Sequence, residues 1–423
     1  MTARATGEAR YEPLSSVLRR RQRVRAGVVQ LASVVVALVL GLTIPQIDGG
    51  AMLDTRAVTQ LLVGLAAALI PFMGVVFSLL FLVVQFGATN WTPRLNLFRD
   101  NPIVWRSFAY LTAVIVWSAT AALVTSSRDE VSVVVPITAM VSVLAALTVF
   151  RAIQMEAFRS IQLAPTIAAI VGRGRVVLDA LYQDRSGDGP VALPEAPEAL
   201  PEVTAELRWE HHSGVLRQID LPTLVRVATE LDAVVELRVQ VGSIISEGGV
   251  AILVRGGGGG TGGGARAVAG SGSGSAAPVG ELLEALDVGL ERTFDQDPLF
   301  AFQLLVDIAL RALSPALNDQ TTALHAIDAI DSLLTPLARR HLGIGHIRSA
   351  TGELRVVLPV PDWDDYVRLA LDDIAHSGRD NPRITSRLLL LVDTLADLAL
   401  PDRRPTLEAW HDRLAAASAP AAL

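Results

Sequence analysis

The chain has 423 residues and a formal net charge of −7, with 43 acidic residues, 36 basic residues and no cysteine. Lysine is absent too, since all 36 basic residues are arginine. These absences exclude disulfides, thiol catalysis, cysteine-ligated metals and every reaction that needs a Schiff-base, P-loop or lipoyl-carrying lysine. The negative charge disfavours general binding to nucleic acid.

Four long apolar runs predict an integral membrane protein. A span needs roughly 20 apolar residues, and lipid tolerates only elements whose backbone groups pair internally, so we expect helices. A basic arm (residues 1–26) precedes a transmembrane domain (residues 27–153). Within that domain the predicted spans are residues 27–44, 57–88, 103–125 and 131–150.

The distribution of arginine predicts the orientation of these spans. Arginines crowd the segment before the first span, and others follow the second and fourth spans. Because positively charged flanks stay on the cytoplasmic side, we expect both termini in the cytoplasm and a multi-pass protein of the inner (plasma) membrane.

The second span carries polar residues near its predicted cytoplasmic end: Ser78, Gln85 and Asn90. Polar groups in apolar spans often line a pathway, but they also form hydrogen bonds between helices. Gly64 and Gly74 are small residues that let a neighbouring helix approach closely. The three polar residues are therefore candidates for a pathway in an oligomer, with interhelical bonding as the alternative.

Residues 154–254 predict a helical stalk, interrupted at Pro165, and a small β-rich subdomain. Strands at 215–219 and 234–241 flank a short helix at 221–232. The stretch 239–254 resembles the second half of a biotinyl- or lipoyl-type barrel sandwich in its V-x-x-G spacing, although no lysine is present to carry the prosthetic group. An ordinary hairpin is an equal alternative.

Residues 255–278 are predicted to be a disordered linker, since they are rich in glycine and serine and have almost no apolar residues to bury. A G-x-G-x-x-G spacing occurs there by virtue of the glycine run, but no helix opens directly after it, as nucleotide binding would require. Modest shortening of this linker is expected to leave expression and oligomeric state unchanged.

Residues 279–423 predict a helical α+β domain centred on a helical hairpin. Asp297 is expected to cap the first helix with Pro298 at its first position. Ser314-Pro315 ends that helix, and Asn318 or Asp319 caps the second helix, which ends with Arg339 and Arg340.

The connection of this hairpin is the candidate cytoplasmic site. Asp307 and Arg311 are four residues apart on an otherwise apolar surface, so they are expected to pair. The polar residues of the connection are Ser314, Asn318, Asp319, Thr321 and Thr322. Helix capping and turn chemistry explain the same residues without a ligand, so both interpretations stay open.

Two long motifs are the most distinctive parts of the chain. They are FSLLFLVVQFGATNWTPRL at 77–95 and QDPLFAFQLLVDIALRALSPALNDQTTALHAID at 296–328. Together they resemble the bacterial predicted membrane proteins catalogued as domain of unknown function 2254. The resemblance covers nearly the whole chain. It implies four spans followed by a cytoplasmic domain, and it carries over no catalytic residue.

The sequence thus predicts an α-helical integral membrane domain of four transmembrane helices and an α+β cytoplasmic C-terminal domain. No catalytic motif is recognisable, so we expect a non-enzymatic protein with no cofactor and no metal. The leading expectation is a homo-oligomer that forms a channel or pore-like conduit. The alternative is a membrane-anchored scaffold or sensor whose cytoplasmic domain binds a partner protein or a small ligand.

Overall fold

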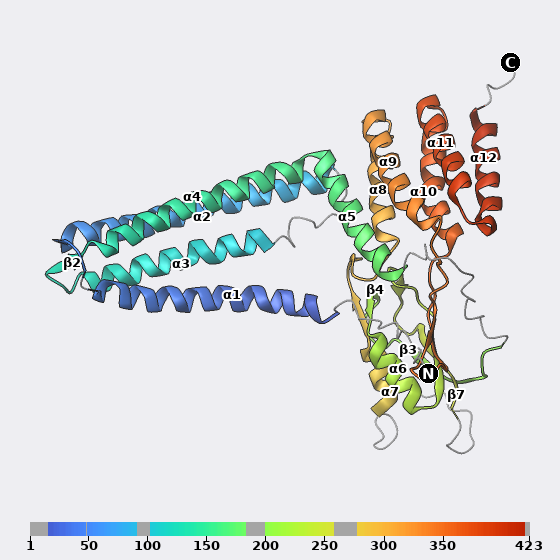
Figure 1. Ribbon diagram of the computed structural model, residues 1–423, viewed down its shortest axis with the longest axis horizontal. Coiled ribbons are helices and arrows are strands. Elements are labelled where there is room, and N and C mark those ends of the chain that lie inside the picture. Colours follow the sequence, from blue (N-terminus) through green and yellow to red (C-terminus); the bar gives the residue numbers. More distant parts are fainter. Residues whose placement is uncertain (1–15, 48, 91–101, 183–198, 258–276, 419–423) are drawn as a thin grey trace, which may run out of the picture. The chain divides into compact units, whose positions relative to one another are not determined.

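The chain divides into two compact units, an N-terminal unit (Val17–Thr166) and a C-terminal unit that begins at Ile167. The structure is a computed structural model, and it describes residues 16–47, 49–90, 102–182, 199–257 and 277–418 (Figure 1). The predicted linker at 255–278 lies almost wholly outside the described residues. Each unit is taken by itself below.

Four long helices form the N-terminal unit: α1 (Ser16–Thr43), α2 (Thr55–Asn90), α3 (Pro102–Thr125) and α4 (Val134–Ile161). Each holds a stretch that is long and apolar enough to cross a membrane, and these stretches are Gly27–Gln46, Thr55–Leu82, Trp105–Thr125 and Val134–Phe158. The prediction of four apolar helices is confirmed. The boundaries differ, because α1 begins inside the predicted basic arm and α4 continues beyond residue 153.

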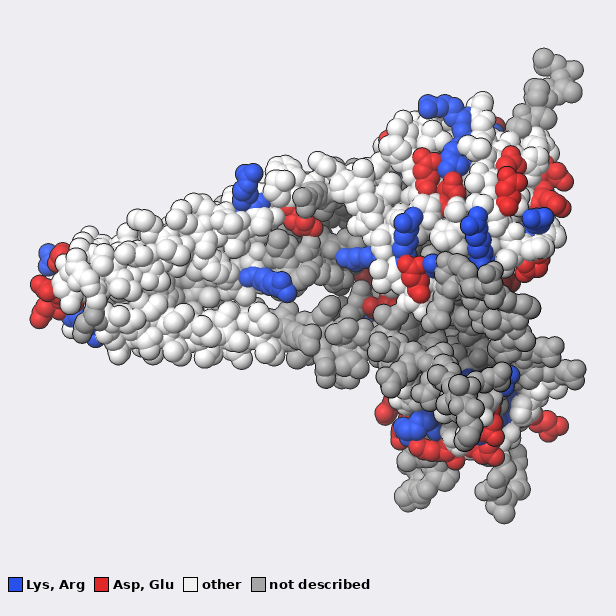
Figure 2. All heavy atoms as spheres, viewed as in Figure 1, with Lys and Arg blue, Asp and Glu red and all other residues white. Residues whose placement is uncertain are grey.

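Hydroxyl groups inside these helices bond to the backbone of their own helix. The side chains of Ser78, Ser118 and Thr138 donate to the carbonyl four residues earlier, at 3.0, 2.7 and 2.8 Å. Such bonds satisfy a polar group where no water is present. On the face seen in Figure 2, the middle of these helices shows no charged side chain, and charged side chains gather at the tip that holds β1 and β2 and again toward the other end of the helices.

A short sheet joins two connections of the N-terminal unit. Strand β1 (Met52–Asp54) follows the turn η1 (Ile44–Gln46) and pairs antiparallel with β2 (Glu130–Ser132). The connection between α1 and α2 therefore lies beside the connection between α3 and α4. This is the arrangement expected of four spans that alternate in direction.

Helix α5 (Leu163–Leu181) follows α4 after the single residue Gln162, and from Ile167 onward it belongs to the C-terminal unit. The predicted interruption of the stalk near Pro165 is confirmed. Pro165 lies in the first turn of α5, where a missing N–H costs the helix no hydrogen bond.

Two sheets make up the β-rich part of this unit. The larger has the order β3-β7-β5-β10-β9 and the smaller the order β6-β4-β8. Strands β5 and β10 run parallel and the other neighbours antiparallel. The strands are β3 (Val203–Arg208), β4 (Gly214–Ile219), β5 (Ala233–Leu237), β6 (Ile244–Ile245), β7 (Val250–Gly256), β8 (Leu286–Gly289), β9 (His346–Arg348) and β10 (Leu354–Val357).

One apolar core joins both sheets with helices α6 (Leu221–Glu230) and α7 (Ala277–Glu284). Leu216 of β4, Ile252 of β7 and Val356 of β10 all belong to it and are fully buried. The ordinary-hairpin interpretation of 239–254 is wrong, because β6 and β7 belong to different sheets and do not pair with each other. The turn glycines carry the chain from one sheet to the other.

Five helices follow: α8 (Phe300–Ala312), α9 (Gln320–Leu337), α10 (Trp363–Gly378), α11 (Pro382–Leu398) and, after the turn η2 (Pro401–Arg403), α12 (Arg404–Ser418). Helices α8 and α9 form the predicted hairpin, and Figure 1 shows α11 and α12 continuing the row. Asp362 caps α10 through a capping box with Asp365, as its position before an acidic turn predicts.

Two details of the predicted hairpin are wrong. Helix α8 begins at Phe300, two residues later than Pro298, because Asp297 is held in a buried ion pair instead of standing at the N-cap. Helix α9 ends at Leu337, before Arg339 and Arg340, since Arg403 reaches in to bond the carbonyls of Leu337 and Arg340.

Candidate functional site

The last turns of α5 are anchored to the helices of the C-terminal unit. A Cβ added at Gly174 would lie 2.6 Å from the Cβ of Ala301, so only glycine allows α5 to approach α8 this closely. Further along, Asp179 pairs with Arg340 at 2.6 Å. The buried hydroxyls of Tyr182 and Tyr366 share a hydrogen bond of 2.9 Å. Gly174 and Asp179 of α5, together with Tyr182 directly after it, therefore fix the end of this helix in the C-terminal unit.

A buried carboxylate organises the turn before α8. The side chain of Asp297 is 1% exposed and forms two bonds with the guanidinium of Arg292, at 2.6 and 2.8 Å. Its Oδ1 also accepts from the backbone N–H of Leu299 at 3.2 Å. Burial raises the pKa of the Asp297 carboxyl, and the bonds from Arg292 oppose that shift.

The same turn is tied to the β-rich part by the residue before Asp297. The amide of Gln296 accepts from the N–H of Ile219 at 2.9 Å and donates to the carbonyl of Ile219 at 3.1 Å. Ile219 ends β4, and Asp220 directly after it caps α6 by accepting from the N–H of Thr223. The turn before α8 and the start of α6 are therefore fixed side by side.

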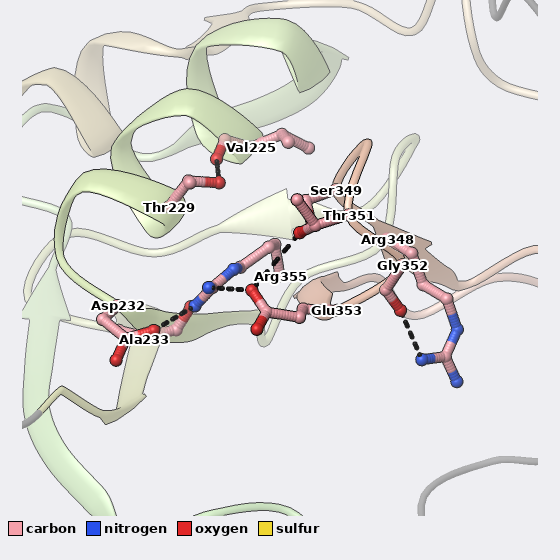
Figure 3. Close-up of polar contacts among 10 residues, drawn as sticks. All are labelled: Val225, Thr229, Asp232, Ala233, Arg348, Ser349, Thr351, Gly352, Glu353 and Arg355. Atoms are coloured by element: carbon pink, nitrogen blue, oxygen red, sulfur yellow. Dashed lines mark hydrogen bonds and ion pairs between the residues drawn. The ribbon is translucent and has the colours of Figure 1, made fainter.

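The β9–β10 hairpin is anchored by Arg355 (Figure 3). The side chain of Arg355 is 8% exposed and pairs with Asp232 at 2.9 Å and with Glu353. Asp232 lies directly before β5, so this pair holds β10 against its parallel neighbour. Arg348 turns toward the tip of the hairpin and donates to the carbonyl of Gly352 at 3.0 Å.

These elements line a cavity of about 490 Å³ that opens to the surface. Its lining comes from separate segments of the chain, at 177–182, 219–225, 240–241, 295–298, 344–348 and 358–361. Most lining residues are apolar, among them Val177, Val225, Ile347 and the two prolines of the last segment, Pro359 and Pro361. The polar lining residues are Asp179, Tyr182, Asp220, Gln240, Asp295, Gln296 and Arg348. Size and composition are those of a small-molecule site.

The hairpin connection predicted as a site does not line this cavity. Asp319 is the N-cap of α9, and its carboxylate accepts from the N–H of Thr322 at 3.1 Å and from the hydroxyl of Thr322 at 2.6 Å. These hydrogen bonds lower the pKa of Asp319. The backbone carbonyl of Ser314 accepts from the backbone N–H of Asn318 at 2.9 Å. Asn318 adopts a φ of 44°. Thr321 is exposed. Capping accounts for these contacts, and a binding role of the connection stays a prediction.

Asp307 and Arg311 both lie on α8 and are half-buried. The carboxylate of Asp307 accepts from the side-chain amide of Gln303 at 2.9 Å. Pairing of Asp307 with Arg311 stays a prediction.

The predicted pathway residues lie along α2. The hydroxyl of Ser78 donates to the carbonyl of Gly74, as described above. Gln85 is exposed on the helix surface. The side chain of Asn90 lies outside the described residues. A pathway through these three residues stays a prediction.

Two acidic residues of α9, Asp328 and Asp331, act together in the structure. Both pair with Arg387 of α11, at 2.7 Å each. Their pairing joins α9 to α11 and accounts for the acidic face of α9.

Sequence reasoning missed the residues that line the cavity and those that surround the buried Asp297 beside it. Arg292 and Gly242 gave no signal, because a lone arginine and a turn glycine are common. The segment FDQDP at 294–298 was singled out as distinctive, and it does hold Asp297 and two polar lining residues. That this segment forms one wall of a cavity could be recognised only from the positions of α5, α6 and the β9–β10 hairpin.

The connection can be tested by substitution. Asp319→Ala removes the N-cap of α9 and is expected to cost about 1 kcal/mol of unfolding free energy. Thr322→Ala and Asn318→Ala are expected to cost less than about 1 kcal/mol, since the carboxylate still accepts from the backbone. Given the predicted pairing, Arg311→Ala should destabilise more than these, because it leaves the half-buried carboxylate of Asp307 without its cation. Urea unfolding of the full chain in nanodiscs measures all four.

A different result would assign the connection a function. If Asn318→Ala and Thr322→Ala fold like the wild type but lose ligand binding, partner binding or ion flux, the connection is a site. If they match the wild type in every assay, it is a helix cap only.

Comparison with known proteins places the chain in a family. A family model described as "Predicted membrane protein (DUF2254)" matches residues 24–394, which confirms the resemblance carried by the motifs at 77–95 and 296–328. An uncharacterized protein of Mycobacterium bovis and one of Mycobacterium tuberculosis are each 27% identical over 371 residues, covering 84% of this chain and 66% of the relative. The chain thus spans just under two thirds of the length of these curated relatives. No solved structure matches the chain significantly.

Proposed function

We propose that this chain, which belongs to the DUF2254 family of predicted membrane proteins, is a membrane-anchored sensor whose C-terminal unit binds a small, largely apolar molecule. The observation that carries the proposal is the cavity of about 490 Å³. Ligand sites of roughly 300–1,000 Å³ are lined mainly by apolar side chains with a few polar groups that orient the ligand. The role requires no catalysis, so the proposed protein is not an enzyme.

Helix α5 supports a sensing role. At one end of α5, Val177, Asp179, Ala180 and Leu181 contribute to the cavity wall, and its other end follows α4 after one residue. A ligand that prefers one position of α5 shifts the population toward that position. The shift is thereby passed along the chain to the last membrane helix. In the scaffold version of this proposal, the same unit binds a cytoplasmic protein partner.

A bulky substitution in the cavity tests the binding. Val225→Trp places a large side chain in the space, and it is expected to weaken binding of the neutral probe 4-phenylbutan-1-ol at least tenfold. Val176→Trp is the matched control, because Val176 is 63% exposed on α5 and does not line the cavity. Calorimetric titration of the full chain in zwitterionic nanodiscs, with empty nanodiscs subtracted, gives both affinities.

Two results contradict the proposal. One is a wild-type chain that takes up the probe no better than empty nanodiscs. The other is equal, saturable binding by the wild type and Val225→Trp with both proteins folded, since the probe would then lie elsewhere.

The topology is proposed as four spans in the inner (plasma) membrane with both termini cytoplasmic. Its support is the arginine distribution and the pairing of β1 with β2, which keeps the first and third connections together. Alkaline phosphatase fused after Asp48 is expected to be active, and a fluorescent protein fused after Gly189 is expected to fluoresce. The reverse pattern would place the C-terminal unit outside the cytoplasm.

The oligomeric channel is the second proposed function. The observation in its favour is that Gly64 and Gly74 of α2 have no described atom within 4 Å of the position a Cβ would occupy. A second copy is thus free to approach α2 closely at these glycines. Ion flux across liposomes that hold the purified oligomer tests it, and no flux for several ions with a folded oligomer present would argue strongly against a channel.

A further inference from the structure

One polar side chain of the cavity wall has a donor that the described part of the chain leaves unused. The amide nitrogen of Gln240 is buried and has no hydrogen-bond acceptor among the described residues. The other polar lining residues bond to other parts of the chain: Asp179 to Arg340, Tyr182 to Tyr366, Asp220 to Thr223, Asp295 to Thr293, Gln296 to Ile219 and Arg348 to Gly352. Native structures keep few buried donors without an acceptor, so the one at Gln240 calls for a reason.

The two glutamines of the wall differ in what their amides do. The amide of Gln296 accepts from the N–H of Ile219 at 2.9 Å and donates to the carbonyl of Ile219 at 3.1 Å. Both ends of that amide are therefore used by the protein itself. The nitrogen of Gln240 belongs to the same kind of group in the same wall, and its N–H groups are available to a bound molecule.

The backbone at Gln240 is fixed in a turn. The carbonyl of Gln240 accepts from the N–H of Ser243 at 3.0 Å, and the N–H of Gly242 donates to the carbonyl of Leu216 at 2.8 Å. The N–H of Leu216 in turn donates to the carbonyl of Ser243 at 2.9 Å. Leu216 is fully buried in β4, so the turn is tied to the core and holds Gln240 at the cavity wall.

The amide of Gln240 can turn although its backbone is fixed. The last torsion of a glutamine side chain has a broad, roughly two-fold energy profile. A half-turn exchanges the positions of the amide nitrogen and the amide oxygen. Because Gln240 is half-buried and lines the cavity, its amide can direct an N–H into the cavity without a change of the backbone.

Resting on the proposed function, we infer that the molecule bound in this cavity carries a carbonyl oxygen on an apolar body, and that the side-chain amide of Gln240 donates a hydrogen bond to that oxygen. A neutral carbonyl suits a neutral amide, whereas a charged group among apolar side chains needs an opposite charge. A hydrogen bond that apolar surface shields from water is also electrostatically stronger than one in water.

Two probes of the same shape test this inference. They are 5-phenylpentan-2-one and (4-methylpent-4-enyl)benzene, in which a CH2 group replaces the carbonyl oxygen. Calorimetric titration into the full chain in zwitterionic nanodiscs, with empty nanodiscs subtracted, gives both affinities. Gln240→Met removes the donor and keeps the length of the side chain. It is expected to weaken binding of the ketone about fivefold or more, the effect of one hydrogen bond, and to leave binding of the alkene within about twofold.

Two further variants assign the effect to the N–H of Gln240. Gln240→Glu keeps the shape of the amide, but an ionised carboxylate has no N–H to donate. It is expected to weaken binding of the ketone at least as much as Gln240→Met does. Gln320→Met is the matched control, because Gln320 is also half-buried but begins α9 and does not line the cavity. It is expected to change neither affinity.

The outcomes separate the inference from the proposed function. If Gln240→Met leaves ketone binding unchanged, or weakens ketone and alkene equally, the amide forms no bond to the carbonyl and the inference is wrong. The proposed function survives that result if Val225→Trp still weakens both probes. If neither probe binds beyond empty nanodiscs, the proposed function fails and the inference with it.

Discussion

Arg292→Ala is expected to lower the free energy of unfolding of the C-terminal unit by roughly 3–5 kcal/mol. The substitution leaves the carboxylate of Asp297, whose side chain is 1% exposed, without its cationic partner. A buried charge that loses its partner keeps the cost of leaving water and loses the attraction that offset it. Urea unfolding of the full chain in nanodiscs measures the change.

An exposed ion pair provides the matched control. Arg368 pairs with Asp365 at 2.6 Å, a distance like that between Arg292 and Asp297, but its side chain is 70% exposed. Arg368→Ala is expected to cost less than about 1 kcal/mol, because solvent screens an exposed pair. Equal effects of the two substitutions would show that Asp297 reaches water or another donor when Arg292 is removed.

The loss of unfolding free energy caused by Arg292→Ala should depend on pH. Burial raises the pKa of Asp297 above its ordinary value of 3.8, and loss of Arg292 removes the bonds that oppose this shift. A carboxyl whose pKa is higher in the folded state than in the unfolded state binds more protons when folded. Its stability contribution is therefore full below pH 3.8 and is lost as the pH rises through the folded-state pKa. The difference in unfolding free energy between the variant and the wild type is expected to narrow as the pH falls toward 4.

Gly242→Ala is expected to destabilise the C-terminal unit by about 2–5 kcal/mol. Gly242 has a φ of 89°, a conformation that costs a residue with a Cβ roughly 1–2 kcal/mol. The added Cβ would also lie 2.3 Å from an oxygen of Asp297 and 2.9 Å from a nitrogen of Arg292. Overpacking of this kind costs typically 1–3 kcal/mol more, because neither member of the buried pair can move without breaking it.

Gly248→Ala separates backbone strain from overpacking. Gly248 has a φ of 75°, yet no described atom lies within 4 Å of the position of an added Cβ. Only the conformational cost of roughly 1–2 kcal/mol is expected there. If the two alanine variants lose the same stability, close packing of Gly242 against the ion pair contributes nothing.

Local signals in the sequence were sufficient for the elements that depend on neighbouring residues. Four apolar runs of spanning length predicted the four helices of the N-terminal unit, since no other element buries so many apolar residues in a row. Asp362 was predicted correctly as a helix cap, and Asp319 was one of the two predicted caps of α9, because a cap bonds to the N–H groups two or three residues later. Two long motifs were enough to identify the family.

The tertiary structure decided everything that depends on distant segments. Asp297 was taken for a helix cap, because an acid before Pro298 has the local pattern of one. The folded chain places it against Arg292 and Gly242 instead. Strands β6 and β7 joined different sheets, since the shared core, and not the turn between them, sets their partners.

The cavity shows the same limit. Val177, Val225 and Ile347 are apolar residues that a sequence presents as core, and only their positions around an unfilled space make them a lining. The sequence by itself determined that the chain has four apolar helices of spanning length and an α+β unit, and that it belongs to a family of predicted membrane proteins. The position of a ligand site was left to the tertiary structure, because a cavity is a property of how segments far apart in the chain fail to fill the space between them.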